Sequence, residues 1–145
     1  TERGFSVLEL VTALGIAGIM AGTALSGIQS LERPLPTAAS QLSGFFKQVR
    51  AKAIATTSAY TITAVTSTQV IASYSSSCDS ISPTQDSKLL YNFPSKVALI
   101  GGGWSLCFNP RGLANNNAQI YIQDDDHNYR RIEVFLGGAI RVTSL

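Results

Sequence analysis

Charge is scarce in this sequence of 145 residues: only 14% of the side chains are Asp, Glu, Lys or Arg, and the formal net charge is +2. A disordered chain needs more charge and fewer apolar side chains than the 45% present here, so the composition predicts a folded protein. The small net charge argues against a protein that coats nucleic acid. One histidine and two cysteines cannot supply a zinc site of the usual four ligands without carboxylates. With a single histidine, a nucleophile–histidine–acid set is not credible, so we expect no enzyme, no metal and no cofactor.

What the sequence does have is a long apolar run, Phe5 to Ile28, in which the only ionisable side chain is Glu9. As a helix, its roughly 24 residues would extend about 36 Å, enough to cross a hydrocarbon layer of ~30 Å. One alternative is a buried core helix, but a small domain rarely surrounds a helix that is apolar on every side. Another is a secretory signal peptide, whose apolar stretch is shorter. We expect a membrane span, with Arg3 holding its N-terminal end in the cytoplasm.

The acid inside this run poses a pairing problem. An ionised carboxylate in the bilayer costs a few kcal/mol, and the run contains no Lys, Arg or His. The partner of Glu9 must therefore come from another chain or from a newly made terminus; otherwise the carboxylate is protonated.

A family resemblance begins at the segment Gly4-Phe5-Ser6-Val7-Leu8-Glu9-Leu10, which is similar to the processing site of type IV pilins and type II secretion pseudopilins. The resemblance implies that a prepilin peptidase cuts after Gly4 and that the new amine of Phe5 is N-methylated. It also implies that Glu9 faces the terminal amine of a neighbouring subunit, where the two charges compensate each other in a low dielectric. The expected organisation is a leader at 1–4, a transmembrane and filament-core helix at 5–30, a linker and amphipathic helix at 31–58, and a β-rich globular domain at 59–145.

Prolines 34 and 36 predict a kink or a short extended segment near 31–37. Thr37 is then placed to cap an amphipathic helix that runs to about Thr57. The basic group on this helix, Lys47, Arg50 and Lys52, is expected to be a solvated face. The alternative is a surface for partners or anionic ligands.

Beyond residue 59 the pattern changes to short β-branched runs between turn residues. We expect a hairpin turn at Gly137-Gly138 and a core of Leu42, Phe45, Val49 and alternate strand residues. The expected strands are 60–65, 69–74, 88–93, 97–100, 104–108, 119–123, 130–135 and 139–143. The fold class is thus α+β, a long N-terminal helix packed on an antiparallel sheet domain, as in the pilin fold.

Three further segments resemble the branch of minor pilins and pseudopilins that includes GspH and FimT. They are Leu42–Ile54, in which an arginine precedes Ala-Ile; Cys107–Leu113, which resembles a Phe-x-Pro-x-Gly turn; and Gly138–Val142, which resembles the terminal strand.

Cys78 and Cys107 both follow the predicted span and would lie on the side opposite Arg3. That compartment is oxidising in two-membrane bacteria, which favours a disulfide; two buried free thiols are the alternative.

Two polar segments are candidate binding sites. Asp124, Asp126 and Asn128 alternate like the oxygen ligands of a calcium loop. Such a loop needs glycine and glutamate at the positions that Tyr129 and Phe135 occupy here. We therefore expect a polar hairpin turn with a solvated His127.

Some FimT-like minor pilins bind DNA through Gly-Arg-x-Arg, whose first arginine is replaced here by Ala139. The possible DNA contacts are Arg111, Arg130, Arg131 and Arg141.

The leading hypothesis is a minor pilin or pseudopilin. Its expected partners are the peptidase, the inner-membrane assembly machinery and other pilin subunits, with DNA as a possible further partner. It would be anchored in the inner membrane first and lie in a periplasmic or extracellular filament afterwards. The alternatives are a DNA-capturing pilin for natural transformation, and an anchored protein that never polymerises.

Overall fold

The computed structural model describes residues 33–144 together with Val7 and Val11. The predicted leader, the processing site Gly4-Phe5, Glu9 and most of the predicted span lie outside the described residues. The chain divides into two units, Thr1–Arg33 and Pro34–Leu145, of which the second is named the globular unit. No helix within the described residues is long and apolar enough to cross a membrane.

The globular unit begins with helix α2, Pro34–Thr56. The helix was expected to begin at Thr37, and this start was wrong, because the helix already begins at Pro34. The first four backbone N–H groups of a helix have no partner within it, so both prolines are accommodated in the first turn. At the other end Thr57 has a positive φ of 51°, and the Ser58 N–H donates to the Ala53 carbonyl at 3.1 Å. This is the backbone arrangement that usually closes a helix with glycine.

Eight strands follow the helix, as the sequence predicted. The largest difference is that the third strand starts four residues earlier than expected, at Thr84 rather than Lys88. The strands are β1 (Ala59–Thr66), β2 (Gln69–Ser75), β3 (Thr84–Asn92), β4 (Val97–Ile100), β5 (Ser105–Phe108), β6 (Ala118–Asp124), β7 (Tyr129–Val134) and β8 (Ile140–Ser144).

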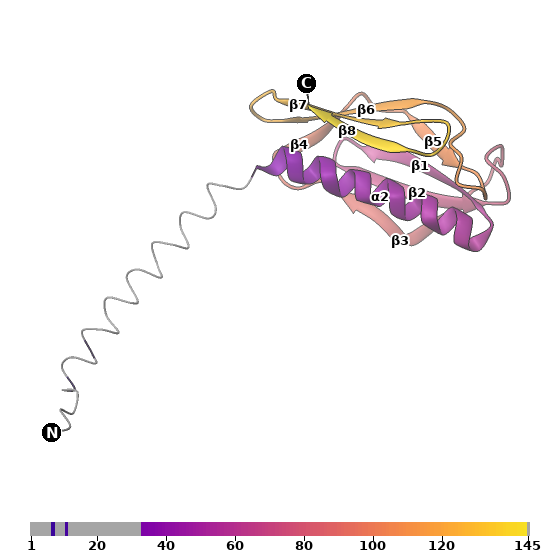
Figure 1. The fold of residues 1–145 in the computed structure, drawn as a ribbon, viewed down its shortest axis with the longest axis horizontal. Coiled ribbons are helices and arrows are strands. Elements are labelled where there is room, and N and C mark those ends of the chain that lie inside the picture. The colour runs from indigo at the N-terminus through magenta and orange to yellow at the C-terminus, as the bar shows by residue number, and fades with distance from the viewer. Residues whose placement is uncertain (1–6, 8–10, 12–32, 145) are drawn as a thin grey trace. The chain divides into compact units, whose positions relative to one another are not determined.

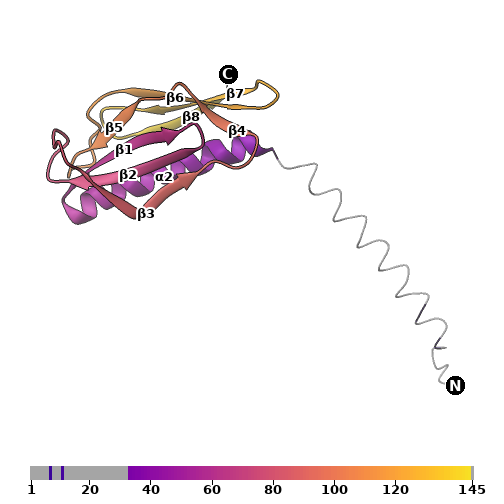
Figure 2. The same cartoon turned by 180° about the vertical axis from the view of Figure 1, so that it is seen from behind.

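The strands form two four-stranded antiparallel sheets, ordered β3-β2-β1-β5 and β4-β6-β7-β8. Helix α2 approaches strands of both sheets. Figure 1 shows it running across the front of the globular unit with β8 beside it, and Figure 2, from behind, shows β1, β2 and β3 in front of it. The expected α+β class, a helix packed on antiparallel sheets, is confirmed.

One core joins the helix to the two sheets. The expected helix residues Leu42, Phe45 and Val49 are all buried in it. Phe46 is fully buried and meets Trp104 edge-on, with the ring centroids 6.1 Å apart. The strands contribute alternate residues, among them Ile62, Val70, Leu106, Ile120, Ile122, Ile132 and Val134. Burial of large apolar side chains at about 1.5–3 kcal/mol each is the main source of the stability of this unit.

Candidate functional site

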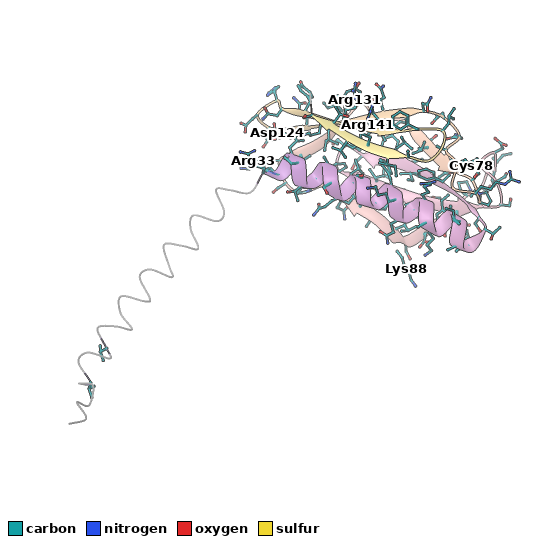
Figure 3. The ribbon with its side chains drawn as sticks, in the orientation of Figure 1. Arg33, Cys78, Lys88, Asp124, Arg131 and Arg141 are labelled. Carbon is teal, nitrogen blue, oxygen red and sulfur yellow. A yellow bond between two sulfur atoms is a disulfide. The ribbon has the colours of Figure 1, made fainter. Side chains whose placement is uncertain are left out.

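Two of the four arginines proposed for DNA contact meet at one buried carboxylate. The register of β7 and β8 places Glu133 opposite Arg141, whose Nε and Nη2 donate to Glu133 Oε2 at 2.8 and 2.6 Å. Arg131, two residues before Glu133 and therefore on the same face of β7, lies 3.3 Å from Oε1. Figure 3 shows Arg131 and Arg141 close together on this sheet. Because one carboxylate serves both guanidinium groups, the cluster keeps a single net positive charge.

The other two arginines do not join this cluster. Arg130 is adjacent to Arg131 in β7, so its side chain leaves the opposite face of the sheet. Arg111 lies in an exposed turn held by Asn109, whose Oδ1 accepts the Arg111 N–H at 2.9 Å. Phosphate binding of useful strength sums several cationic contacts on one surface, whereas Arg130 and Arg131 leave opposite faces of β7.

The basic group of α2 is only in part the solvated face that the sequence predicted, because Lys47 is exposed whereas Arg50 and Lys52 are partly buried. Arg50 Nε donates to the Gly112 carbonyl at 2.8 Å, and its Nη2 donates to the Gly137 carbonyl at 3.3 Å. Lys52 Nζ lies 3.2 Å from Asp86 Oδ2. Of the three, only Lys47 has no ion pair or hydrogen bond within the described residues.

Arg50 is where the three segments that resemble GspH and FimT come together. It extends from the helix segment to the turn that ends at Gly112 and to the hairpin that opens the terminal strand at Gly138. A Cβ on Gly138 would lie 2.5 Å from Arg50 Nε and would overlap the Gly112 carbonyl oxygen, and its φ of +77° also favours glycine. In the sequence Arg50, Gly112 and Gly138 are isolated residues. Only the fold shows that the two glycines pack around the Arg50 guanidinium group.

The ion pair of Lys52 with Asp86 ties the helix to β3. The pKa of Asp86 is lowered, first because the Lys88 backbone N–H donates to Oδ1 at 3.0 Å and further because of Lys52; burial opposes both effects.

We expect Asp86→Asn to lower the free energy of unfolding at pH 7 by about 1 kcal/mol, since the pair is only partly exposed to solvent. A folded-state pKa below the unfolded value of ~3.9 means that the contribution is present above that pH and is lost as the pH falls through the folded pKa. Urea unfolding at pH 7 and at pH ~2 will test this, because the wild type and the variant should converge at low pH. The matched control is Asp79→Asn, which removes an exposed acid without an ion pair in the described residues. A gap that persists at pH ~2 would contradict the assignment.

Tyr91 supplies a second link between α2 and β3. Burial raises its pKa to about 12, so the phenol remains a neutral donor over the physiological range. Its hydroxyl donates to the Ala38 carbonyl at 3.3 Å.

The predicted disulfide is present: Cys78 and Cys107 are joined, with their Cα atoms 5.7 Å apart. Cys78 lies in the segment between β2 and β3, at the end of the globular unit where Figure 3 labels it. Cys107 is a buried residue of β5, on the far side of β1 from β2 in the sheet order. The bond therefore fixes the β2–β3 connection across the sheet.

The acidic segment between β6 and β7 is a polar hairpin turn, as expected. Asp124 Oδ1 accepts the Asn128 backbone N–H at 2.9 Å, and the Asn128 side chain also donates to this carboxylate, which lowers the pKa of Asp124. His127 is exposed and has a φ of 64°.

Glu133, the carboxylate that binds Arg131 and Arg141, was not predicted from the sequence. The signal that could have found it is Arg131-Ile132-Glu133-Val134, in which opposite charges alternate with apolar residues and so share the outer face of a strand.

No protein-family model and no curated protein matches this sequence. Solved structures do match. Two crystal forms of the type IV minor pilin FimU from Pseudomonas aeruginosa are 16% and 15% identical to this chain, both with a TM-score of 0.57; 75% of this chain is covered in each case, and 87% and 92% of the FimU chains. The minor pseudopilin EpsH from the type 2 secretion system of Vibrio cholerae is 12% identical, with a TM-score of 0.59, and 77% of this chain and 97% of the EpsH chain are covered. The chain therefore has the fold of a minor pilin or pseudopilin.

Proposed function

We propose that this chain is a structural subunit of the type IV pilin kind, a minor pilin of a pilus or a minor pseudopilin of a type II secretion system. The observation that carries the proposal is a combination: a globular unit with the fold of FimU and EpsH follows an apolar run that opens with Gly4-Phe5 and contains one acid, Glu9. Neither feature alone distinguishes a subunit from an unrelated anchored protein. The two structural neighbours are a minor pilin and a minor pseudopilin, which supports a structural role.

In the proposed mechanism the apolar run acts twice. It first anchors the chain in the inner membrane, with the globular unit on the periplasmic side. After cleavage behind Gly4, the same apolar surface packs among the helices of neighbouring subunits in a filament. Glu9 then fixes the register by pairing with the N-methylated amine of an adjacent Phe5, because an unpaired charge in that environment is costly.

DNA capture is the less favoured function, for a reason found in the geometry. Arg131 and Arg141 are both engaged by Glu133, and Arg130 and Arg111 lie elsewhere. The side chains available for phosphate are therefore fewer than the sequence suggested.

We expect Glu9→Val to insert into the membrane normally and to be incorporated into filaments at least about 100-fold less, because removing one partner of a buried ion pair costs about 3–5 kcal/mol. Quantitative mass spectrometry of sheared filaments and of membranes will measure both pools. The matched control is Glu2→Val, which removes the acid in the predicted leader and is expected to leave incorporation unchanged.

Two further results test the proposal as a whole. A mature N-terminus at methylated Phe5 is expected, and substitution of Gly4 should retain the chain in the membrane fraction. Recovery of the chain with Thr1 still attached and absent from every filament would reject the proposal in favour of an anchored protein that does not polymerise.

A further inference from the structure

A groove of about 490 Å³ runs between α2 and the last strand, β8. Apart from Lys47, the helix wall is built of small side chains, and a Cβ added at Gly44 would meet no heavy atom within 4 Å. The strand wall presents Ile140 and the partly exposed Val142. The helix wall includes Ala39, Ser40, Ser43 and Gly44. The groove is thus open and lined by both apolar and polar groups, and a backbone edge lies beside it.

That edge is the least protected of the strand edges in the described part of the chain. β8 ends its sheet, so one side of its backbone has no strand partner among the described residues. Natural proteins usually prevent such edges from pairing with other chains by charged side chains, by a short edge strand or by further pairing. Of the other end strands, β3 carries Asp86 and Lys88, β4 has only four residues, and β5 is extended by a bridge between Phe108 and Ala114. The only charged residue of β8 is Arg141, which is paired with Glu133 on the other face of the sheet.

The charge of the groove is positive. Lys47 and Arg130 line it, and none of the described residues around it is acidic. Neither cation makes an ion pair or a side-chain hydrogen bond with any residue that the structure describes. A carboxylate brought into the groove would therefore find unneutralised cations in a partly apolar setting, where their attraction is stronger than in bulk water.

We propose that this groove binds an extended, carboxylate-bearing segment of a partner protein, which adds to β8 as a fifth strand of the sheet. Main-chain hydrogen bonds to the β8 edge would supply binding, and alternate side chains would enter the groove and supply selectivity. The dimensions agree, because the helix from Pro36 to Lys47 rises about 16 Å and a five-residue strand spans a similar ~17 Å. The proposal goes beyond filament assembly and does not depend on it, since binding by a chain that never polymerises would satisfy it.

The test uses the full chain in detergent micelles and a fluorescent probe peptide, Ser-Glu-Thr-Val-Thr-Glu-Ser, whose glutamates and valine share one strand face. Gly44→Trp fills the groove at a position with free space around the Cβ. Gln48→Trp adds the same bulk at an exposed position of the same helix that does not line the groove. Saturable binding is expected for the wild type and Gln48→Trp, and binding weaker by about tenfold or more for Gly44→Trp. Circular dichroism should show that both variants keep the fold.

Two modified peptides separate strand addition from simple charge attraction. Replacing both glutamates with glutamine should weaken binding, and methylating alternate backbone nitrogens should abolish it, because strand addition requires those donors. Equal binding of the methylated peptide, equal binding by the two tryptophan variants, or no saturable binding would each overturn the proposal. Self-association of the chain that Gly44→Trp alone removes would also overturn it, because the occupant would then be a second copy.

Discussion

Gly138→Ala is expected to destabilise the globular unit by about 3–4 kcal/mol, which is large for the addition of one methyl group. Gly138 has a φ of +77°, where an alanine is strained by roughly 1–2 kcal/mol. The new Cβ would overlap the Gly112 carbonyl oxygen and crowd the Arg50 guanidinium. Relief requires Arg50 to move, which endangers its two hydrogen bonds to the Gly112 and Gly137 carbonyls, each worth about 1 kcal/mol. Urea unfolding of the globular unit will measure the loss.

The neighbouring glycine is the matched control. A Cβ on Gly137 would meet no heavy atom within 4 Å, so Gly137→Ala is expected to change stability by less than about 1 kcal/mol. Arg50→Met should cost about as much as Gly138→Ala, and the double variant should cost less than the sum, since both remove the same junction. Additive effects, or equal effects of the two glycine variants, would show that the junction around Arg50 does not contribute as described.

Reduction of the Cys78–Cys107 disulfide is expected to lower the free energy of unfolding by about 3.5 kcal/mol, from the loop-entropy relation for a sequence separation of 29 residues. For a unit of this size, such a loss corresponds to a fall in Tm on the order of 15 °C. Thermal unfolding with and without a thiol reductant will measure it. The bond also holds the β2–β3 connection against β5, so reduction should increase hydrogen exchange in residues 76–83 before any global unfolding.

The control for reduction is the double variant Cys78→Ala with Cys107→Ala. The reductant should have no effect on this variant, whose stability should lie near or somewhat below that of the reduced wild type, because Cys107 is buried and its truncation leaves a small cavity. A wild type whose Tm is unchanged by complete reduction would contradict the expected contribution.

Much of the secondary structure could be predicted because it depends on near neighbours. The change from apolar residues at three-to-four-residue spacing to alternating β-branched residues located the helix and all eight strands. The turns at Gly137-Gly138 and Asp124–Asn128 were predictable because they consist of residue types that favour turns. The start of α2 was misjudged, because proline signals a break without indicating whether it falls before or inside the first turn. Pro34 and Pro36 sit inside it.

Side-chain partners could not be predicted in the same way. The sequence places Arg50 on a helix, but its acceptors are 62 and 87 residues away. Glu133 went unnoticed because its pairing with Arg141 depends on the register of two strands, which is set by the packing of the sheet.

By itself, the sequence determined the spacing of apolar residues in each helix and strand and the apolar N-terminal run with its single acid. It also determined the resemblance of Gly4–Leu10 to a pilin processing site. All of these features lie within short stretches of chain. Only the tertiary structure decided which cations are free. It neutralised Lys52 with Asp86, engaged Arg131 and Arg141 on Glu133, and left Lys47 and Arg130 beside the groove of α2 and β8. The physical reason is that an electrostatic interaction depends on distance in space, and distance between remote segments is decided by the packing of the helix and the two sheets around one core.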